Sequence, residues 1–132
     1  MKSDRFFDTN ILLYRYSDDA GKAEIARGLI NEGGIVSVQV LSEFTSVARR
    51  KFKFDWPRVR LALAAFDEAF QTLPVSIASH ERALDIAEVT GITIYDALHL
   101  ACAEEAGCTT FISEDLNHGQ RIGAVAVFNP FR

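Results

Sequence analysis

The chain has 132 residues, 48% of them hydrophobic and 24% charged, and a formal net charge of −4 at pH 7. This length and composition predict one globular domain, residues 1–132, that buries a core without covalent cross-links. The negative charge argues against general binding of polyanions, and no apolar run approaches the roughly 20 residues that a membrane span needs. Two cysteines and the lack of a signal-like segment predict a cytoplasmic protein with reduced thiols.

Short apolar runs alternate with longer segments of helical periodicity along the chain. Residue content predicts five strands, at 5–7, 35–38, 73–77, 109–112 and 124–128. Apolar spacing and candidate caps, with Ser79 as the cap of the fifth helix, predict six helices, at 10–16, 20–30, 40–50, 56–70, 81–89 and 95–106. Residues 113–123 are predicted to form a polar loop. This alternation predicts an α/β fold, a three-layer α/β/α sandwich around a mainly parallel sheet with right-handed crossovers.

Four acidic residues stand in otherwise apolar or small-residue settings: Asp8, Glu43, Asp96 and Asp115. Asp8 and Asp115 follow predicted strands, and Glu43 lies in the first turns of a helix that directly follows a strand. The carboxyl ends of parallel strands share one edge of a sheet, where open α/β sheets place their sites. Clustered carboxylates with no His or Cys ligand pattern favour Mg²⁺ or Mn²⁺ over zinc. The sequence therefore predicts metal-dependent phosphodiester chemistry at this edge.

Each acid also has a purely structural interpretation. Asp8 is suited to cap the helix that follows it, and Glu43 to a solvated helix face. Asp96 begins a helix that is apolar almost all round, so an acid there is expected to be buried and to need a partner. Its structural alternative is a favourable negative charge at the helix N-terminus. Asp115 lies in a loop, where acids are common. Removing these four acids from the total of 18 leaves 14, which equals the 14 Lys and Arg, so a metal-filled site permits a polyanionic substrate.

Polar neighbours extend the candidate site. The Asn10 amide is placed to orient the Asp8 carboxylate or a metal-bound water. Ser113 is placed to hold Asp115 or to contact a substrate phosphate, because alternate residues of an extended segment share one side. Asn117 is a candidate outer ligand.

Three further features have both a structural and a functional interpretation. His99 lies three residues after Asp96, which permits a hydrogen bond on the helix surface, but a packed core histidine is favoured. The basic run at residues 49–53 is favoured as a solvated helix end, with phosphate contact as the alternative. Five nearby aromatic residues are predicted to contribute to a partner groove or a dimer contact, with a packed core as the alternative: Phe52, Phe54, Trp56, Phe66 and Phe70.

The chain resembles the PIN-domain nucleases in four segments: FDTNIL at 7–12, SEF at 42–44, YDALHLA at 95–101 and SEDL at 113–116. Each segment is weak alone, but their order, spacing and flanking residues together are specific, and the likeness spans essentially the whole chain. Within that family the chain is most similar to the small bacterial VapC-type toxins of type II toxin–antitoxin pairs.

The resemblance implies a PIN-like α/β/α nuclease domain, frequently dimeric, in which the four acids gather one or two Mg²⁺ or Mn²⁺ ions. It implies single-stranded RNA as the substrate and a small antitoxin protein that blocks the site. Water attack on the phosphodiester would leave a 5′-phosphate and a 3′-hydroxyl. Two positions differ from the family: Asn117 stands where an acid is common, which leaves the second metal open, and Ser113 stands where Thr is common.

Three alternatives belong to other functional classes. A phosphatase of the haloacid-dehalogenase type also has an aspartate after its first strand, but it needs a second acid where this chain has Asn10, and it gives no reason for Glu43. A non-catalytic domain of the same fold would have no need of all four acids. A stand-alone PIN nuclease in RNA processing differs from a toxin in lacking an antitoxin, so an adjacent short reading frame would separate those two.

Overall fold

The computed structural model describes residues 3–132; the first two residues of the expected domain, Met1 and Lys2, lie outside the described residues. Six strands form one sheet in the order β3-β2-β1-β4-β6-β5. Neighbouring strands pair in parallel except for β5, which runs antiparallel to β6. The strands are β1 Arg5–Phe7, β2 Gly34–Ser37, β3 Phe70–Leu73, β4 Thr110–Ile112, β5 Arg121–Ile122 and β6 Val125–Phe128.

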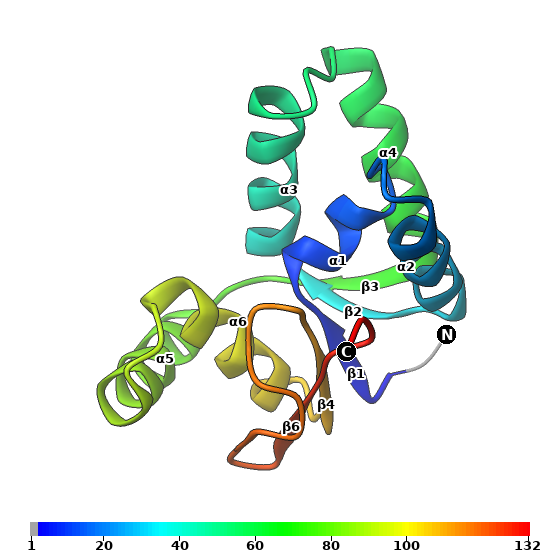
Figure 1. The fold of residues 1–132 in the computed structure, drawn as a ribbon. Helices are drawn as coiled ribbons and strands as arrows, with labels where there is room; N and C mark the ends of the chain where they lie inside the picture. The colour runs from blue at the N-terminus through cyan, green and yellow to red at the C-terminus, as the bar shows by residue number, and fades with distance from the viewer. Residues whose placement is uncertain (1–2) are drawn as a thin grey trace.

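Helices cover both faces of this sheet (Figure 1). They are α1 Thr9–Tyr14, α2 Ala20–Glu32, α3 Val38–Arg50, α4 Trp56–Ala69, α5 Ile77–Thr90 and α6 Ile94–Glu105. The first four pack against one another on one side, while α5 and α6 pack together on the other. The predicted three-layer α/β/α sandwich is therefore confirmed. None of the helices in the described part of the chain is long and apolar enough to cross a membrane.

The core forms around β1, the strand between β2 and β4. Phe6 and Phe7 are fully buried. The Phe6 ring stacks on Phe111 of β4 with centroids 5.9 Å apart, and the Phe7 ring contacts Phe70 of β3 at 4.8 Å. Gly34 allows β2 to approach this strand, because a Cβ there would lie 2.7 Å from the Phe7 ring. The three-residue strand is thus held mainly by aromatic packing.

The structure differs from the predicted elements in two places. The strand predicted at 73–77 is β3, which ends at Leu73, and the helix predicted at 81–89 with Ser79 as its cap begins at Ile77 with Ser76 as its cap. The Ser76 hydroxyl accepts from the Ser79 backbone N–H at 3.0 Å and the Ser79 hydroxyl accepts from the Ser76 N–H at 3.4 Å. This capping box outweighs the β-propensity of the preceding residues. The second difference is β5, which lies inside the predicted loop.

The five aromatic residues of the predicted partner surface divide between core and surface. Phe54, Phe66 and Phe70 are buried, so the packed-core interpretation holds for them. Phe52 is half-buried, and Trp56 is 54% exposed beneath the Arg49 guanidinium at 4.5 Å. Of the five, only Phe52 and Trp56 are open to a partner.

Candidate metal-binding active site

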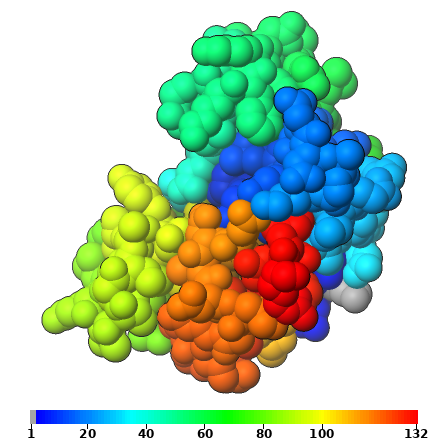
Figure 2. All heavy atoms as spheres, in the orientation of Figure 1, coloured from blue at the N-terminus to red at the C-terminus, as the bar shows by residue number. Residues whose placement is uncertain are grey.

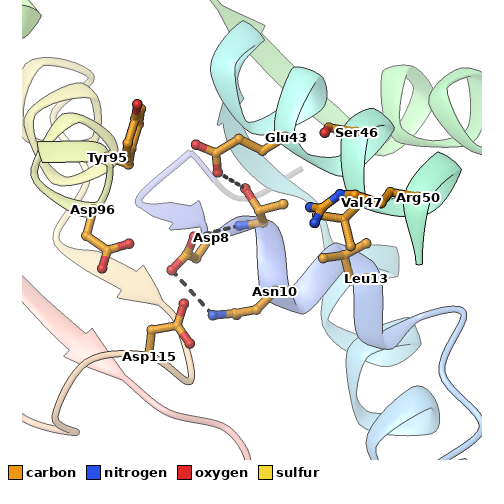
Figure 3. A pocket seen from close by; sticks show the side chains of 11 residues that line it. Asp8, Asn10, Leu13, Glu43, Ser46, Val47, Arg50, Tyr95, Asp96 and Asp115 are labelled. Carbon is orange, nitrogen blue, oxygen red and sulfur yellow. Dashed lines mark hydrogen bonds between the residues drawn. The ribbon is translucent and has the colours of Figure 1, made fainter. Parts of the chain in front are cut away.

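Two neighbouring strands end side by side at the candidate site. The last residues of β1 and β4 are paired in register, so Asp8 and Ser113 leave the sheet together. Asp96 joins them from the first turn of α6, and Asp115 from the loop after β4. One carboxylate oxygen each of Asp8, Asp96 and Asp115 lies within 4.8 Å of the others. Figure 3 shows the three carboxylates facing a common space.

Asp8 is both a helix cap and the buried member of this group. Its Oδ1 accepts from the Thr9 backbone N–H at 2.7 Å, and its Oδ2 accepts from the Ser113 hydroxyl at 2.7 Å and the Asn10 amide at 3.4 Å. The side chain is 3% exposed. Burial raises the pKa of Asp8 from 3.8 to about 6, although His99 and Ser113 oppose that rise. Capping and membership of an acid cluster are thus compatible in one residue.

Ser113 and Asn10 connect the loop after β4 to the start of α1. Ser113 is fully buried, and its hydroxyl both donates to Asp8 and accepts from the Asp115 backbone N–H at 3.0 Å. That geometry fits the interpretation that Ser113 holds Asp115, because the hydroxyl is not open to a substrate phosphate. The Asn10 carbonyl oxygen accepts from the Glu114 backbone N–H at 3.4 Å. Asn117 is exposed in the same loop.

Asp96 lies at the N-terminus of α6, where Thr93 caps the helix by accepting from the Asp96 backbone N–H at 3.2 Å. Six residues of the helix are buried, as its apolar sequence predicted: Ala97, His99, Leu100, Ala101, Cys102 and Ala103. The Asp96 carboxylate itself is half-buried. Burial and the neighbouring Asp115 carboxylate raise its pKa. Close like charges in a partly dry setting are an arrangement that a cation relieves.

Glu43 lies outside the three-carboxylate group but in the same pocket. Its Oε2 accepts from the Thr9 hydroxyl at 3.0 Å and lies 3.0 Å from His99 Nε2, and its Oε1 accepts from the Gln39 amide at 3.2 Å. Burial alone would raise the pKa of Glu43, but these donors hold it below its ordinary value. Glu43 is therefore an ionised, firmly oriented carboxylate.

His99 is a packed core histidine, as favoured, and its partner was not predicted. It is 1% exposed, and its Nε2 faces Glu43 and lies 4.0 Å from Asp8 Oδ1, rather than bonding to Asp96 on the helix surface. Because an ionised carboxylate only accepts hydrogen bonds, Nε2 must carry the proton that is donated to Glu43. The other ring nitrogen, Nδ1, has no partner. The sequence signal was a polar residue one turn after an acid in an apolar helix; the partner on α3 could not be inferred from it.

The acids line an open pocket of about 380 Å³ between the two helical layers. In Figure 2 it is the hollow between α3 and the mass formed by α6 and the loop after β4. Arg50, Ser46 and Tyr95 also line it. Arg50 is exposed in the last turn of α3, as favoured, and its place on the pocket wall leaves the phosphate-contact alternative open. Tyr95 and Ser46 had no sequence signal beyond lying next to an acid or on the same helix as one.

Comparisons with known proteins agree with this geometry. The family model of the PIN domain matches residues 5–122. None of the curated proteins matches the sequence significantly. Among solved structures, a toxin–antitoxin complex from Klebsiella pneumoniae is 22% identical with a TM-score of 0.72, covering 96% of this chain and 97% of that one.

Two other solved structures have a similar fold. The DNA-bound VapBC of Salmonella typhimurium is 15% identical with a TM-score of 0.70, covering 96% of this chain and 97% of that one. VapC20 of Mycobacterium tuberculosis, a toxin that cleaves the sarcin-ricin loop, is 18% identical with a TM-score of 0.64, covering 81% and 86%. At these identities the likeness concerns the fold alone.

Proposed function

The chain belongs to the PIN domain family, and from this premise we propose that it is a Mg²⁺- or Mn²⁺-dependent endoribonuclease acting on single-stranded RNA, with residues 1–132 as one nuclease domain. The observation that carries the proposal is the convergence of three carboxylates within 4.8 Å on the wall of an open pocket. Their donor set is all oxygen, which suits hard divalent cations. Burial first, and then the neighbouring carboxylates, raises the pKa values of Asp8 and Asp96, and a bound cation would counteract both effects.

In this proposal Asp8, Asp96 and Asp115 hold one or two metal ions. A divalent ion bound there supplies the Lewis acidity that activates water at neutral pH and offsets charge on the phosphate. Glu43, ionised and held by its three donors, orients the attacking water and takes its proton. The new bond joins the water oxygen to phosphorus, the bond to O3′ breaks, and the O3′ leaves with a proton from solvent. The products are a 5′-phosphate and a 3′-hydroxyl.

Two residues complete the proposed catalytic set without touching the substrate. Ser113 fixes Asp8 and the backbone before Asp115. Asn10 supports the Asp8 carboxylate and the loop after β4. Both therefore act by positioning metal ligands, the role that outer partners of metal sites usually have.

RNA cleavage tests the proposal directly. Purified protein with Mg²⁺ or Mn²⁺ is expected to cut single-stranded RNA, and a chelator is expected to stop it. Asp96→Asn keeps the side-chain shape but removes a charge, so activity should fall about a hundredfold or more, since even outer partners of metal ligands are worth 10- to 100-fold. Asp67→Asn, the same change at an exposed position on α4, is the matched control. Equal activity in Asp96→Asn and wild type would reject the assigned site.

We also propose that the nuclease is the toxin of a toxin–antitoxin pair, acting in the cytoplasm where RNA is available. Support comes from the similar folds, which include toxin–antitoxin complexes and an RNA-cleaving toxin. A small antitoxin would cover the open pocket. A homodimer is proposed as well, supported by apolar side chains that α5 leaves exposed, Ile77 at 77%, Leu84 at 49% and Val89 at 85%. Light scattering that reports a monomer at all concentrations would reject the dimer.

A further inference from the structure

The candidate metal-binding pocket adjoins two further hollows, which are lined by α1 and by the turns after α1 and α3. The first, of about 290 Å³, shares Asn10 and Leu13 with the pocket. The second, of about 460 Å³, shares Ser17 and Phe52 with the first. Because they share lining residues, the three hollows adjoin one another from the acids, past α1, to the turn that joins α3 to α4. We call the part beyond the acids, between α1 and the turn after α3, the α1–α3 groove.

Basic side chains lie at the two ends of this path, on either side of the middle hollow. Arg50 lines the metal-binding pocket, and Lys51 and Arg58 line the far hollow. All three are exposed, and within the described residues no ion pair joins them to a carboxylate. Asp18 is the one acid on the wall of the far hollow. The groove therefore carries a local excess of positive charge on a chain whose net charge is −4.

Apolar side chains lie between these cations. Leu13 and the half-buried Phe52 line the middle of the groove. The Arg58 guanidinium lies 4.0 Å from the centroid of the Phe54 ring, a contact that holds its charge at the groove wall. Cations beside aromatic surface are the features that bind single strands, because phosphates meet the charges and bases lie on the apolar faces.

An RNA strand accounts for the groove better than a protein segment does. A docked protein needs a well-packed apolar centre, but Phe54 and Phe66 beneath this region are 3% and 2% exposed and offer no surface. A strand cut at the acids must also continue beyond them, and the groove provides a path that starts there. Its cations would attract the phosphates of such a strand.

We propose that the α1–α3 groove binds the single-stranded RNA on one side of the cleavage position. Arg50 contacts the phosphate nearest the cut, Lys51 and Arg58 contact phosphates further along, and Phe52 supports a base between them. This inference rests on the proposed nuclease function, because the cleavage position defines which part of the RNA the groove would bind.

The test compares two doubly charge-reversed proteins. Lys51→Glu with Arg58→Glu changes the groove, and Arg60→Glu with Arg121→Glu makes the same charge change at exposed positions that do not line it. Binding of a fluorescently labelled, mixed-sequence single-stranded RNA is measured by anisotropy in the Asp96→Asn background without metal, so the RNA stays intact. Cleavage of the same RNA is measured without that background substitution.

The protein with Lys51→Glu and Arg58→Glu is expected to bind RNA more weakly than the control. Its KM should rise with little change in kcat, since the lost contacts bind the substrate and the transition state equally. The slope of log affinity against log salt should become shallower by about 1.4, or about 0.7 for each lost phosphate contact. If the two proteins have equal RNA affinity, KM and salt slope while wild type still cuts RNA, the groove proposal fails and the nuclease proposal stands. Loss of antitoxin binding with unchanged RNA binding would make it a protein surface instead. Wild type that neither binds nor cuts RNA would overturn both proposals.

Discussion

His99 joins the carboxylate of Glu43 to the metal-binding acids through one buried imidazole ring. Its Nε2 is 3.0 Å from Glu43 and 4.0 Å from Asp8. Its ring is buried beside Phe6, where an apolar side chain would also pack. We infer that the contribution of the histidine to the site is its bond to Glu43.

Replacing His99 tests this inference. His99→Leu removes the donor to Glu43 and leaves the three carboxylates in place. We expect kcat to fall about 10- to 100-fold, the range for outer partners of a metal site. The Mn²⁺ concentration that gives half of the maximal rise in melting temperature should change much less. His99→Gln, which keeps an N–H donor, should recover part of kcat. If both variants keep the wild-type kcat, His99 is only a core residue.

The pKa of Asp8 predicts how the stability of the metal-free protein depends on pH. Its folded value of about 6 exceeds the ordinary value of 3.8, so the folded state binds a proton more tightly than the unfolded state. Stability must then fall as pH rises between those values, by about 3 kcal/mol. Asp8→Asn lacks this titration, so wild type should lose stability relative to the variant between about pH 4 and about pH 6. Denaturant unfolding with a chelator present measures this difference; a pH-independent difference would contradict the assignment.

At the scale of elements, the site was predictable where chemistry follows directly from the order of strands and helices. Asp8 and Asp115 were placed together because both follow strands of a parallel sheet, whose carboxyl ends share an edge. Asp96 was singled out because an acid in an apolar helix needs a partner. Neither inference required the strand order, which depends on long-range packing and was not predicted.

Other features depend on contacts between distant segments and left little trace in the sequence. The bond from His99 to Glu43 joins residues 56 positions apart on different helices. The position of β3 was misjudged because β-branched residues after Leu73 favoured a strand, whereas Ser76 and Ser79 form a local cap that starts α5. β5 has two residues and is defined by its pairing with β6, which no periodicity reveals.

At the scale of the whole molecule, the acids lie in an open hollow between two groups of helices (Figure 2). α1 and α3 form one side, and the start of α6 with the loop after β4 forms the other. Asp115 is exposed and Asp96 is half-buried, so these two carboxylates face solvent, whereas Asp8 is buried behind them. If the chain is the proposed ribonuclease, its active site is open to cellular RNA once the protein folds, and the proposed antitoxin supplies the control that the fold itself does not.

Growth of a bacterial host tests that conclusion. Induced expression of the chain alone should arrest growth, and Asp96→Asn, produced at the same level, should not, because only the charge that holds the metal has been removed. Co-expression of a short reading frame adjacent to the gene should relieve the arrest and yield a complex with the wild-type protein. Arrest by the variant as well would mean that the effect is not nucleolytic. If the wild-type protein does not arrest growth but cleaves RNA when purified, it is a stand-alone nuclease. Its activity in the cell is then limited by which RNA can enter the open pocket.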